Sequence, residues 1–394
     1  MINSNSKDII IGFTELRSEF PQIKKYLKTK NIILTNRGTP FAIIKNYQEI
    51  KSYRCSDGAS LNGASLSGAS LSGASLNGAS LHHTKIIESV PNFSTSDPKI
   101  LKEIIKAIEK TPTAKILDYS SDEDHNRSVI TLIGNSKSIV EAMFNATKIA
   151  GKLINIEKHQ GLHPFIGATD VIPLVPLKNS TFAECKKLSE KLAKKIAKEL
   201  KIPTYLYEKS AKKPQNKNLA NIRKGRYETL KQEIKTNKKR FPDFGPKKLN
   251  KAGATAIGAR KILIAFNVNL KSLNRTNALF TRRSFNEEEQ YVSSIKQIAK
   301  TLRPSNNGFP ALKALGLYLK SKKCYQISMN FTDFKKTNLK QVFDFIKKEA
   351  KKYNLQITES ELIGLAPKDA LPKNPRKTLL LKDFNEKKIL ENHL

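Results

Sequence analysis

The sequence contains no tryptophan, only three cysteines and about half as many acidic as basic residues. Cys55, Cys185 and Cys324 are far apart in the chain and form no C-x-x-C pair. This usage argues against a disulfide framework and against a zinc framework. It fits a reducing compartment, so we expect a cytoplasmic protein.

Long apolar runs are also absent. The longest are far shorter than the ~20 residues that a membrane span requires. Residues 1–8 lack the basic region and apolar stretch of a signal peptide. We therefore expect neither a membrane partner nor a secretory leader. Hydrophobic residues still make up 39% of the 394 residues, which allows two or three domains with ordinary cores.

The scarcity of acids leaves a formal net charge of +36. Such an excess indicates either a polyanionic partner, nucleic acid first, or lysines spread over a solvated surface. Residues 1–56 hold ten Lys and Arg and four Asp and Glu, so most of the excess lies elsewhere. Because it is not concentrated in a tail and no arginine-rich aromatic platform is present, we favour the dispersed surface.

Alternating strand and helix patterns begin near residue 85. Apolar spacing predicts the order strand, helix, strand, strand, helix, strand, and then a second copy of it. This order is typical of ferredoxin-like subdomains and of an α+β or α/β fold. The expected strands are 86–90, 114–119, 128–133 and 168–175 in the first copy, and 262–270, 312–319, 326–331 and 355–358 in the second. The expected helices are 98–110, 136–156, 284–302 and 339–353.

A different pattern separates the two copies. A helix is expected at 183–200 and a strand at 204–207, and the polar, lysine-rich residues 208–252 are expected to cover the functional site. The tail at 375–394 is charged and has no clear partner.

The first eighty residues differ from the rest. Apolar spacing predicts a helix at 14–27, and strands are expected at 31–35 and 41–44 around a turn. Residues 58–82 repeat Gly-Ala-Ser-Leu-x five times. Read from alanine, the repeat resembles the pentapeptide pattern of square β-helices. Five copies make little more than one coil, so we predict a flexible linker over an ordered coil.

Two of the six histidines stand four residues apart, at His159 and His163. Gly161 between them permits close approach of a ligand, and Pro164 keeps His163 extended at the mouth of the expected strand 168–175. A general acid or base must stand at such a place. The alternative is a pair of ordinary turn histidines, because no cysteine or acid accompanies them in the pattern.

The stretch 158–173 resembles the H-x-G-x-H-P-x-x-G-A-x-D-V segment of glutamate formiminotransferases. Further similar segments follow in order between about 85 and 371, namely 90–94, 126–127, 203–207, 243–246, 253–260, 265–270, 326–330 and 364–367. The resemblance implies two α/β subdomains with a cleft between them. It also implies transfer of a formimino group from N-formimino-L-glutamate to N5 of tetrahydrofolate, in histidine degradation and one-carbon metabolism.

The resemblance implies roles for particular residues. His163 corresponds to the catalytic histidine, which takes a proton from N5 and gives one to the leaving amine. His159 would orient the loop, and Arg127 would hold a carboxylate. The substrate and folate contacts implied are His159, Asn92, Asn126, Arg127, Gly245, Pro246, Lys247, Lys248, Lys251 and Gly253. The alternative for residues 245–253 is a basic surface loop. Tetrahydrofolate is a co-substrate, and no metal is implied.

The chain departs from the family at three places. Phe165 stands where the family has arginine, Ser120 where it commonly has aspartate, and Thr95-Ser96 where it usually has Glu-Gly. These changes remove groups that bind or orient an acidic substrate, which weakens the expectation of activity. If the loss of arginine at Phe165 has weakened substrate binding, Phe165→Arg, alone or together with Ser120→Asp, should lower KM for that substrate. The alternatives are a related 5-formyltetrahydrofolate enzyme or a folate-binding domain with altered or lost activity.

Residues 10–50 resemble the N-terminal part of Phd/YefM-type antitoxins, with Arg37-Gly38-Thr39-Pro40 at the turn and Tyr47 and Glu49 after it. The resemblance implies a homodimer that contacts DNA through residues 1–56, and the alternative is an accidental fusion. The expected domains are an antitoxin-like unit at 1–56, a repeat linker at 57–84, a first subdomain at 85–180 with its remainder and the folate loop at 181–260, a second subdomain at 261–374 and the tail at 375–394.

Overall fold

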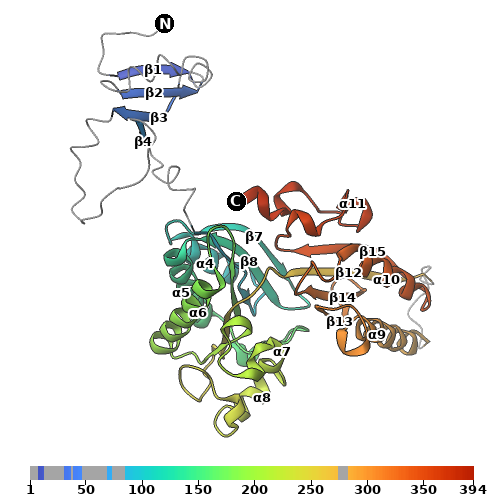
Figure 1. Ribbon diagram of the computed structural model, residues 1–394. Coiled ribbons are helices and arrows are strands. Elements are labelled where there is room, and N and C mark those ends of the chain that lie inside the picture. Colours follow the sequence, from blue (N-terminus) through green and yellow to red (C-terminus); the bar gives the residue numbers. More distant parts are fainter. Residues whose placement is uncertain (1–7, 13–30, 37–38, 47–68, 73–84, 274–282) are drawn as a thin grey trace. The chain divides into compact units, whose positions relative to one another are not determined.

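The computed structural model describes residues 8–12, 31–36, 39–46, 69–72, 85–273 and 283–394. Contacts between residues divide the chain into two compact units, Met1–Thr84 and Lys85–Leu394 (Figure 1).

The first unit contains a four-stranded sheet. Its strands are β1 (Asp8–Gly12), β2 (Asn31–Asn36), β3 (Thr39–Asn46) and β4 (Ala69–Ser72), in that order. β1 runs parallel to β2, and the other two pairs are antiparallel. The strands expected at 31–35 and 41–44 are confirmed as β2 and β3. The helix expected at 14–27 lies outside the described residues.

Strand β4 lies inside the Gly-Ala-Ser-Leu repeat. The prediction of a flexible linker is therefore wrong for Ala69–Ser72, which pairs with Ile43–Asn46 of β3. The physical reason is that the outer edge of β3 offers unpaired N–H and C=O groups, which an extended segment can satisfy. The remainder of the repeat lies outside the described residues.

The second unit begins with a seven-stranded sheet. Its strands are β5 (Ile87–Ser89), β6 (Asn92–Phe93), β7 (Lys115–Asp122), β8 (Arg127–Gly134), β9 (Thr169–Pro176), β10 (Thr204–Leu206) and β11 (Thr255–Ala259). They lie in the order β10-β11-β9-β5-β8-β7, and β6 pairs with both β8 and β9. β5 is antiparallel to its two neighbours, whereas β9, β11 and β10 are mutually parallel.

Three helices cover one face of this sheet: α4 (Pro98–Glu109), α5 (Ser136–Leu153) and α6 (Phe182–Lys195) (Figure 1). Asp97 caps α4 by accepting a hydrogen bond from Lys99 N at 2.7 Å, and Pro98 lies in the first turn. Ile104 of α4 and Met143 of α5 are fully buried against the sheet. The opposite face is thereby left for the functional site.

The second sheet has the order β13-β14-β12-β15, with every pair antiparallel. Its strands are β12 (Ile264–Ser272), β13 (Leu312–Leu319), β14 (Cys324–Phe331) and β15 (Leu355–Ile363), and its helices are α9 (Arg283–Thr301) and α10 (Leu339–Lys351). These elements enclose a core of their own, separate from that of the first sheet. The expected strands and helices of this half are confirmed.

Residues 208–252, called the cap segment from here on, carry two short helices, α7 (Leu219–Ile222) and α8 (Arg226–Glu233). They pack in a third apolar cluster with Phe165 and Ile166. No helix that the structure describes is both long enough and apolar enough to cross a bilayer.

The prediction that the tail at 375–394 has no clear partner is wrong, because the tail packs against the second subdomain. Residues 375–394 begin with α11 (Pro375–Thr378), and apolar side chains beyond it enter the core of the second subdomain. Leu379 is fully buried there, and its carbonyl accepts a hydrogen bond from Ser360 Oγ. Lys388 Nζ forms an ion pair with Asp118 of β7 at 2.8 Å. Charged residues dominate the tail sequence, but its few apolar residues determine where it packs.

Two adjacent leucines test this packing. Leu379→Ala should lower the free energy of unfolding by about 3 kcal/mol, because it leaves a cavity in a closed core. Leu380→Ala should cost less than about 1 kcal/mol, since Leu380 is 36% exposed. Urea unfolding of the full chain measures both. Equal values for the two variants would show that the tail is not part of the core.

Candidate functional site

A cleft of about 1080 Å³ is lined by residues of both subdomains and of the cap segment. Nine Lys and Arg side chains line it, against four Asp and Glu. Such an imbalance gives the cleft a positive potential and favours an anionic ligand.

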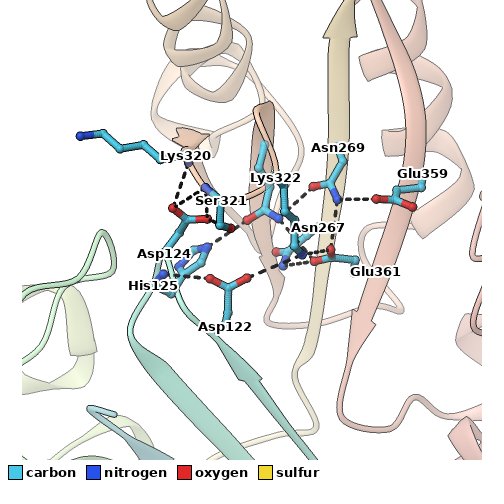
Figure 2. A network of polar contacts seen from close by, with 11 residues as sticks. Asp122, Asp124, His125, Asn267, Asn269, Lys320, Ser321, Lys322, Glu359 and Glu361 are labelled. Carbon is cyan, nitrogen blue, oxygen red and sulfur yellow. Dashed lines mark hydrogen bonds and ion pairs between the residues drawn. The ribbon is translucent and has the colours of Figure 1, made fainter. Parts of the chain in front are cut away.

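The β7–β8 turn, residues 122–126, connects the two subdomains at one end of the cleft. Figure 2 shows Asp124 facing the hairpin between β13 and β14. The Asp124 carboxylate accepts hydrogen bonds from the backbone N–H groups of Lys320, at 2.9 Å, and Ser321, at 3.3 Å. Lys322 of the same hairpin forms ion pairs with Glu361 at 2.6 Å and with Asp122 at 3.7 Å. The turn thus fixes the spacing of the two cleft walls.

The histidine loop, residues 159–166, packs against this turn. A Cβ on Gly161 would lie 2.3 Å from the carbonyl oxygen of His125, so only glycine fits at that crossing. The Leu162 N–H donates to Asp124 O at 3.0 Å. On the other side, Arg226 of the cap segment donates to the carbonyls of Gly161 and His163. The loop is held from both sides, and His163 lines the cleft.

His163 is kept neutral by its surroundings. Burial comes first among the causes that lower its pKa well below the usual value, and the positive charges of Arg127 and Arg223 follow. Its Nδ1 lies 2.9 Å from Pro164 O. A carbonyl can only accept, so Nδ1 carries the proton and Nε2 keeps its lone pair. The ring is therefore a base that is ready at neutral pH.

Asp170 of β9 holds the two guanidinium groups. It is fully buried, and Oδ2 accepts from Arg127 Nη1 at 2.9 Å and from Arg223 Nη2. Oδ1 accepts from Ile166 N at 3.0 Å. Burial alone would raise the pKa of Asp170, but the two guanidiniums hold it below its usual value. Burial lowers the pKa of Arg127 to about 10, so it remains a cation at pH 7.

The structure brings three of the predicted site residues into the cleft: His163, Arg127 and Asn92. Asn92 Oδ1 accepts from Arg127 Nε at 2.9 Å. Asn126 lies outside the cleft and instead links Ser96 N to Gln160 O, with bonds of 2.9 and 2.8 Å.

His159 lies outside the cleft lining as well. Its ring packs edge-on against Phe165, with centroids 4.3 Å apart. Burial, followed by the charges of Arg127 and Arg226, lowers its pKa to about 4. A neutral, packed imidazole supports the loop.

The glycine- and lysine-containing loop at 245–253 does not line the cleft. Gly253 has a φ of +71°, and a Cβ there would lie 2.3 Å from Ile166 O. Lys251 Nζ donates to Lys152 O at 3.1 Å, and Lys247 Nζ lies 3.8 Å from the centre of the Phe241 ring. Gly245, Pro246 and Lys248 are also outside the cleft. The glycine here serves backbone packing against the histidine loop.

Phe165 is 2% exposed and belongs to the cluster below the histidine loop, away from the cleft lining. The Arg226 guanidinium lies over its ring, 4.6 Å from the centroid. The expectation that Phe165→Arg would improve substrate binding is therefore wrong, because this side chain points into a core. A guanidinium already reaches this loop from the cap segment.

The other two departures from the family pattern, at Ser120 and at Thr95, have different positions relative to the cleft. Ser120 lines the cleft, and Asp122 lies two residues further along β7 and lines it as well. Alternation along a strand puts both on one face, so the face retains a carboxylate. Thr95 is 5% exposed and lies outside the cleft, where its Oγ1 accepts from Asp97 N at 3.1 Å.

Several cleft residues were not expected from the sequence. His125 lines the cleft with its ring centroid 6.0 Å from that of His163. Arg223 and Arg226 enter from the cap segment, which was expected to cover the site without any residue being singled out. Within the described residues, no group of three or more His, Cys, Asp or Glu is placed to hold a metal ion.

Two family models match most of the second unit. Residues 86–260 match the model of the formiminotransferase domain, N-terminal subdomain, and residues 265–382 match that of the formiminotransferase domain. Pentapeptide repeats match residues 57–90 in eight copies.

Similar proteins span both subdomains. Glutamate formimidoyltransferase of Streptococcus pyogenes serotype M1 is 41% identical over 79% of this chain and 99% of its own length. That of Thermoplasma acidophilum is 40% identical over 78% of this chain and 97% of its own length. Formimidoyltransferase-cyclodeaminase of Mus musculus is 35% identical over 73% of this chain and 51% of its own length.

Asp170→Asn tests the buried charge cluster. It should lower the free energy of unfolding by about 3–5 kcal/mol at pH 7, because two buried guanidiniums lose their counter-charge. The pKa of Asp170 is depressed in the folded chain, so its contribution is present above about pH 4 and is lost as the pH falls further. The difference in free energy of unfolding between Asp170→Asn and wild type should therefore become smaller below about pH 4.

Glu190→Gln is the matched control for this experiment. Glu190 also stands between two cations, Lys194 and Lys212, but at the surface. Exposed ion pairs contribute little, so its loss should be small. Urea unfolding of both variants at several pH values measures their free energies of unfolding. Equal losses of stability in the two variants would show that Asp170 contributes no more than an exposed ion pair.

Phe165→Arg should destabilise the chain by on the order of 3 kcal/mol, because a second guanidinium would enter an apolar cluster beside Arg226. Phe165→Leu keeps the site apolar and should cost less than about 1.5 kcal/mol. Thermal unfolding reports both changes. A Phe165→Arg protein as stable as wild type would mean that the side chain can reach solvent.

Proposed function

The chain belongs to the formiminotransferase family, and we propose that it transfers the formimino group of N-formimino-L-glutamate to N5 of tetrahydrofolate, releasing glutamate. Tetrahydrofolate is a co-substrate, consumed once in each turnover. The observation that carries this assignment is the neutral imidazole of His163, lining a cationic cleft beside two guanidiniums.

The reaction requires a base that accepts the proton of N5 as the new N–C bond forms. A neutral imidazole can do this only if its pKa stays below the working pH. Burial supplies that condition for His163 by lowering its pKa, and the charges of Arg127 and Arg223 lower it further. Loss of the N5 proton to His163 Nε2 is therefore the step that this environment favours.

The substrates are anions, and the cleft offers cations to hold them. Asp170 neutralises only one of the two guanidiniums that it binds, which leaves a net positive charge beside His163. Among the described residues, Arg223 Nε is buried without a hydrogen-bond partner. An unsatisfied guanidinium donor fits a substrate carboxylate, because charge-assisted bonds of this kind are strong.

The tail of the folate carries further carboxylates. Lys224, Lys313 and Arg303 line the cleft from the cap segment and the second subdomain. We propose that these residues, in place of the lysines at 245–253, meet the glutamate tail of the folate. The support is their position in the cleft and the positive charge that they bring.

We also infer that each subdomain is a ferredoxin-like unit. The support is the strand order β9-β5-β8-β7 in the first and β15-β12-β14-β13 in the second. In both, the first strand lies between the third and the fourth, as this motif requires. The first sheet is then extended by β11 and β10.

His163→Ala should lower kcat for formimino transfer by at least about 100-fold, while KM for tetrahydrofolate changes little. In wild type, kcat/KM should stay level as the pH falls through 6.5, because a depressed pKa keeps His163 unprotonated there. Arg223→Gln removes a positive charge, so the acidic limb should move to higher pH.

His393→Gln serves as a control, because this half-buried histidine lies outside the cleft lining, with Nε2 2.8 Å from Lys387 O. It should match wild type in both rate and pH profile. Steady-state assays between pH 5 and 8 measure all four proteins. A wild type without formimino transfer would refute the proposed function, and an acidic limb at pH 6.5 would refute the electrostatic account.

A further inference from the structure

A second imidazole faces the same part of the cleft as His163. His125 of the β7–β8 turn is 7% exposed and lines the cleft, and the two ring centroids are 6.0 Å apart. A substrate of a few atoms can therefore touch both rings. The transfer needs one group that takes a proton and one that gives a proton. The resemblance implied that His163 does both, but a second imidazole in the cleft allows the two roles to be divided.

The orientation of the His125 ring is fixed by a chain of polar groups from the second subdomain. The carboxylates of Glu359 and Glu361 can only accept, and Asn269 Nδ2 donates to them at 3.3 and 3.0 Å. Asn269 Oδ1 then accepts from Gln326 Nε2 at 2.9 Å. Gln326 Oε1 is left to face His125 Nε2, at 3.0 Å. Figure 2 shows His125 of the turn on one side of this network and Asn269, Glu359 and Glu361 on the other.

This chain determines which nitrogen of His125 carries a proton. Gln326 Oε1 can only accept, so His125 Nε2 must donate, and Nδ1 is the nitrogen that can gain or lose a proton. Gln326 and Asn269 are fully buried, so neither amide can turn over without leaving a buried group unsatisfied. The ring is thereby pre-oriented before substrate binds.

The charges around the two rings differ in sign. His163 stands beside Arg127 and Arg223. The amide chain of His125 ends on carboxylates, and the His125 backbone N–H donates to Asp122 Oδ1 at 2.8 Å. Lys322 also contacts Asp122 and Glu361, and it compensates part of this negative charge. The His163 ring thus lies among cations, whereas the His125 ring is connected to carboxylates. Two titratable groups in such different environments can act as a base and an acid, respectively.

We propose that His125 is a second catalytic residue, the acid that protonates the leaving nitrogen of glutamate. This inference rests on the proposed function. As the bond from N5 to the formimino carbon forms, the N5 proton passes to His163 Nε2. As the bond from that carbon to the glutamate nitrogen breaks, its electron pair stays on nitrogen, which takes a proton from His125 Nδ1. Transfer of a proton from His163 to His125, through solvent, restores the starting state.

The assignment also gives a chemical role to the contact between the β7–β8 turn and the second subdomain. His125 comes from the first subdomain, whereas its orienting residue Gln326 comes from the second. The acid is therefore aligned only when the β7–β8 turn is seated against the hairpin. Gln326 acts through His125 and is a positioning residue.

The test compares His125→Ala, His125→Gln and wild type as full chains, with N-formimino-L-glutamate and tetrahydrofolate as substrates. The glutamine variant keeps an N–H donor toward Gln326 Oε1 but cannot exchange a proton, so it separates chemistry from folding. We expect kcat to fall about 100-fold in both variants, with KM values within about threefold of wild type. Imidazole in the buffer should partly restore kcat in His125→Ala.

Lys320→Ala is the matched control, since Lys320 contributes only its backbone N–H to the same network. Its kcat should equal that of wild type. An active wild type with unchanged kcat in His125→Gln, or with a loss confined to KM, would overturn the role of His125 alone. A wild type without transfer activity would overturn the proposed function instead.

Discussion

The buried carboxylate of Asp170 is the contact on which the site depends. It joins three segments that are distant in sequence: Arg127 at the start of β8, Ile166 of the histidine loop and Arg223 of the cap segment. A buried charge is tolerated only when it is paired and hydrogen-bonded. The cap segment is therefore fixed over the sheet by electrostatics as well as by its small apolar cluster. Burial and the charges of the same two guanidiniums keep His163 neutral.

The two subdomains are joined by polar contacts. Each encloses its own apolar core, so neither needs the other to bury its hydrophobic residues. The contacts between them are directional instead: Asp124 to two hairpin amides, His125 to Gln326, and Lys388 of the tail to Asp118. Directional bonds fix a distance and an angle without filling the space between the walls, which is how a cleft of this size can persist between two packed units.

Two of the three departures from the family pattern have a counterpart in the cleft or beside it. Asp122 supplies a carboxylate on the strand face of Ser120, and Arg226 brings a guanidinium to the loop that contains Phe165. A residue-by-residue comparison of sequences could not show this, because a side chain is supplied to a site by geometry and not by its position in the chain. Loss of a group at one position therefore does not imply loss of the interaction.

The sequence by itself determined the elements and the nature of the motif around His163. Apolar spacing at two and at three to four residues reports which face of a strand or helix is buried, and caps such as Asp97 mark where helices begin. These are local signals, and they predicted both βαββαβ halves and the place of His163 at the mouth of β9. The tertiary structure alone decided that Arg223 and His125 enter the site, that residues 245–253 stay out of it and that the tail enters a core. Such contacts join residues that are distant in sequence: Asp170 and Arg223 are 53 positions apart, and His125 and Gln326 are 201 positions apart. No periodicity extends over such distances, because they are set by how whole elements pack.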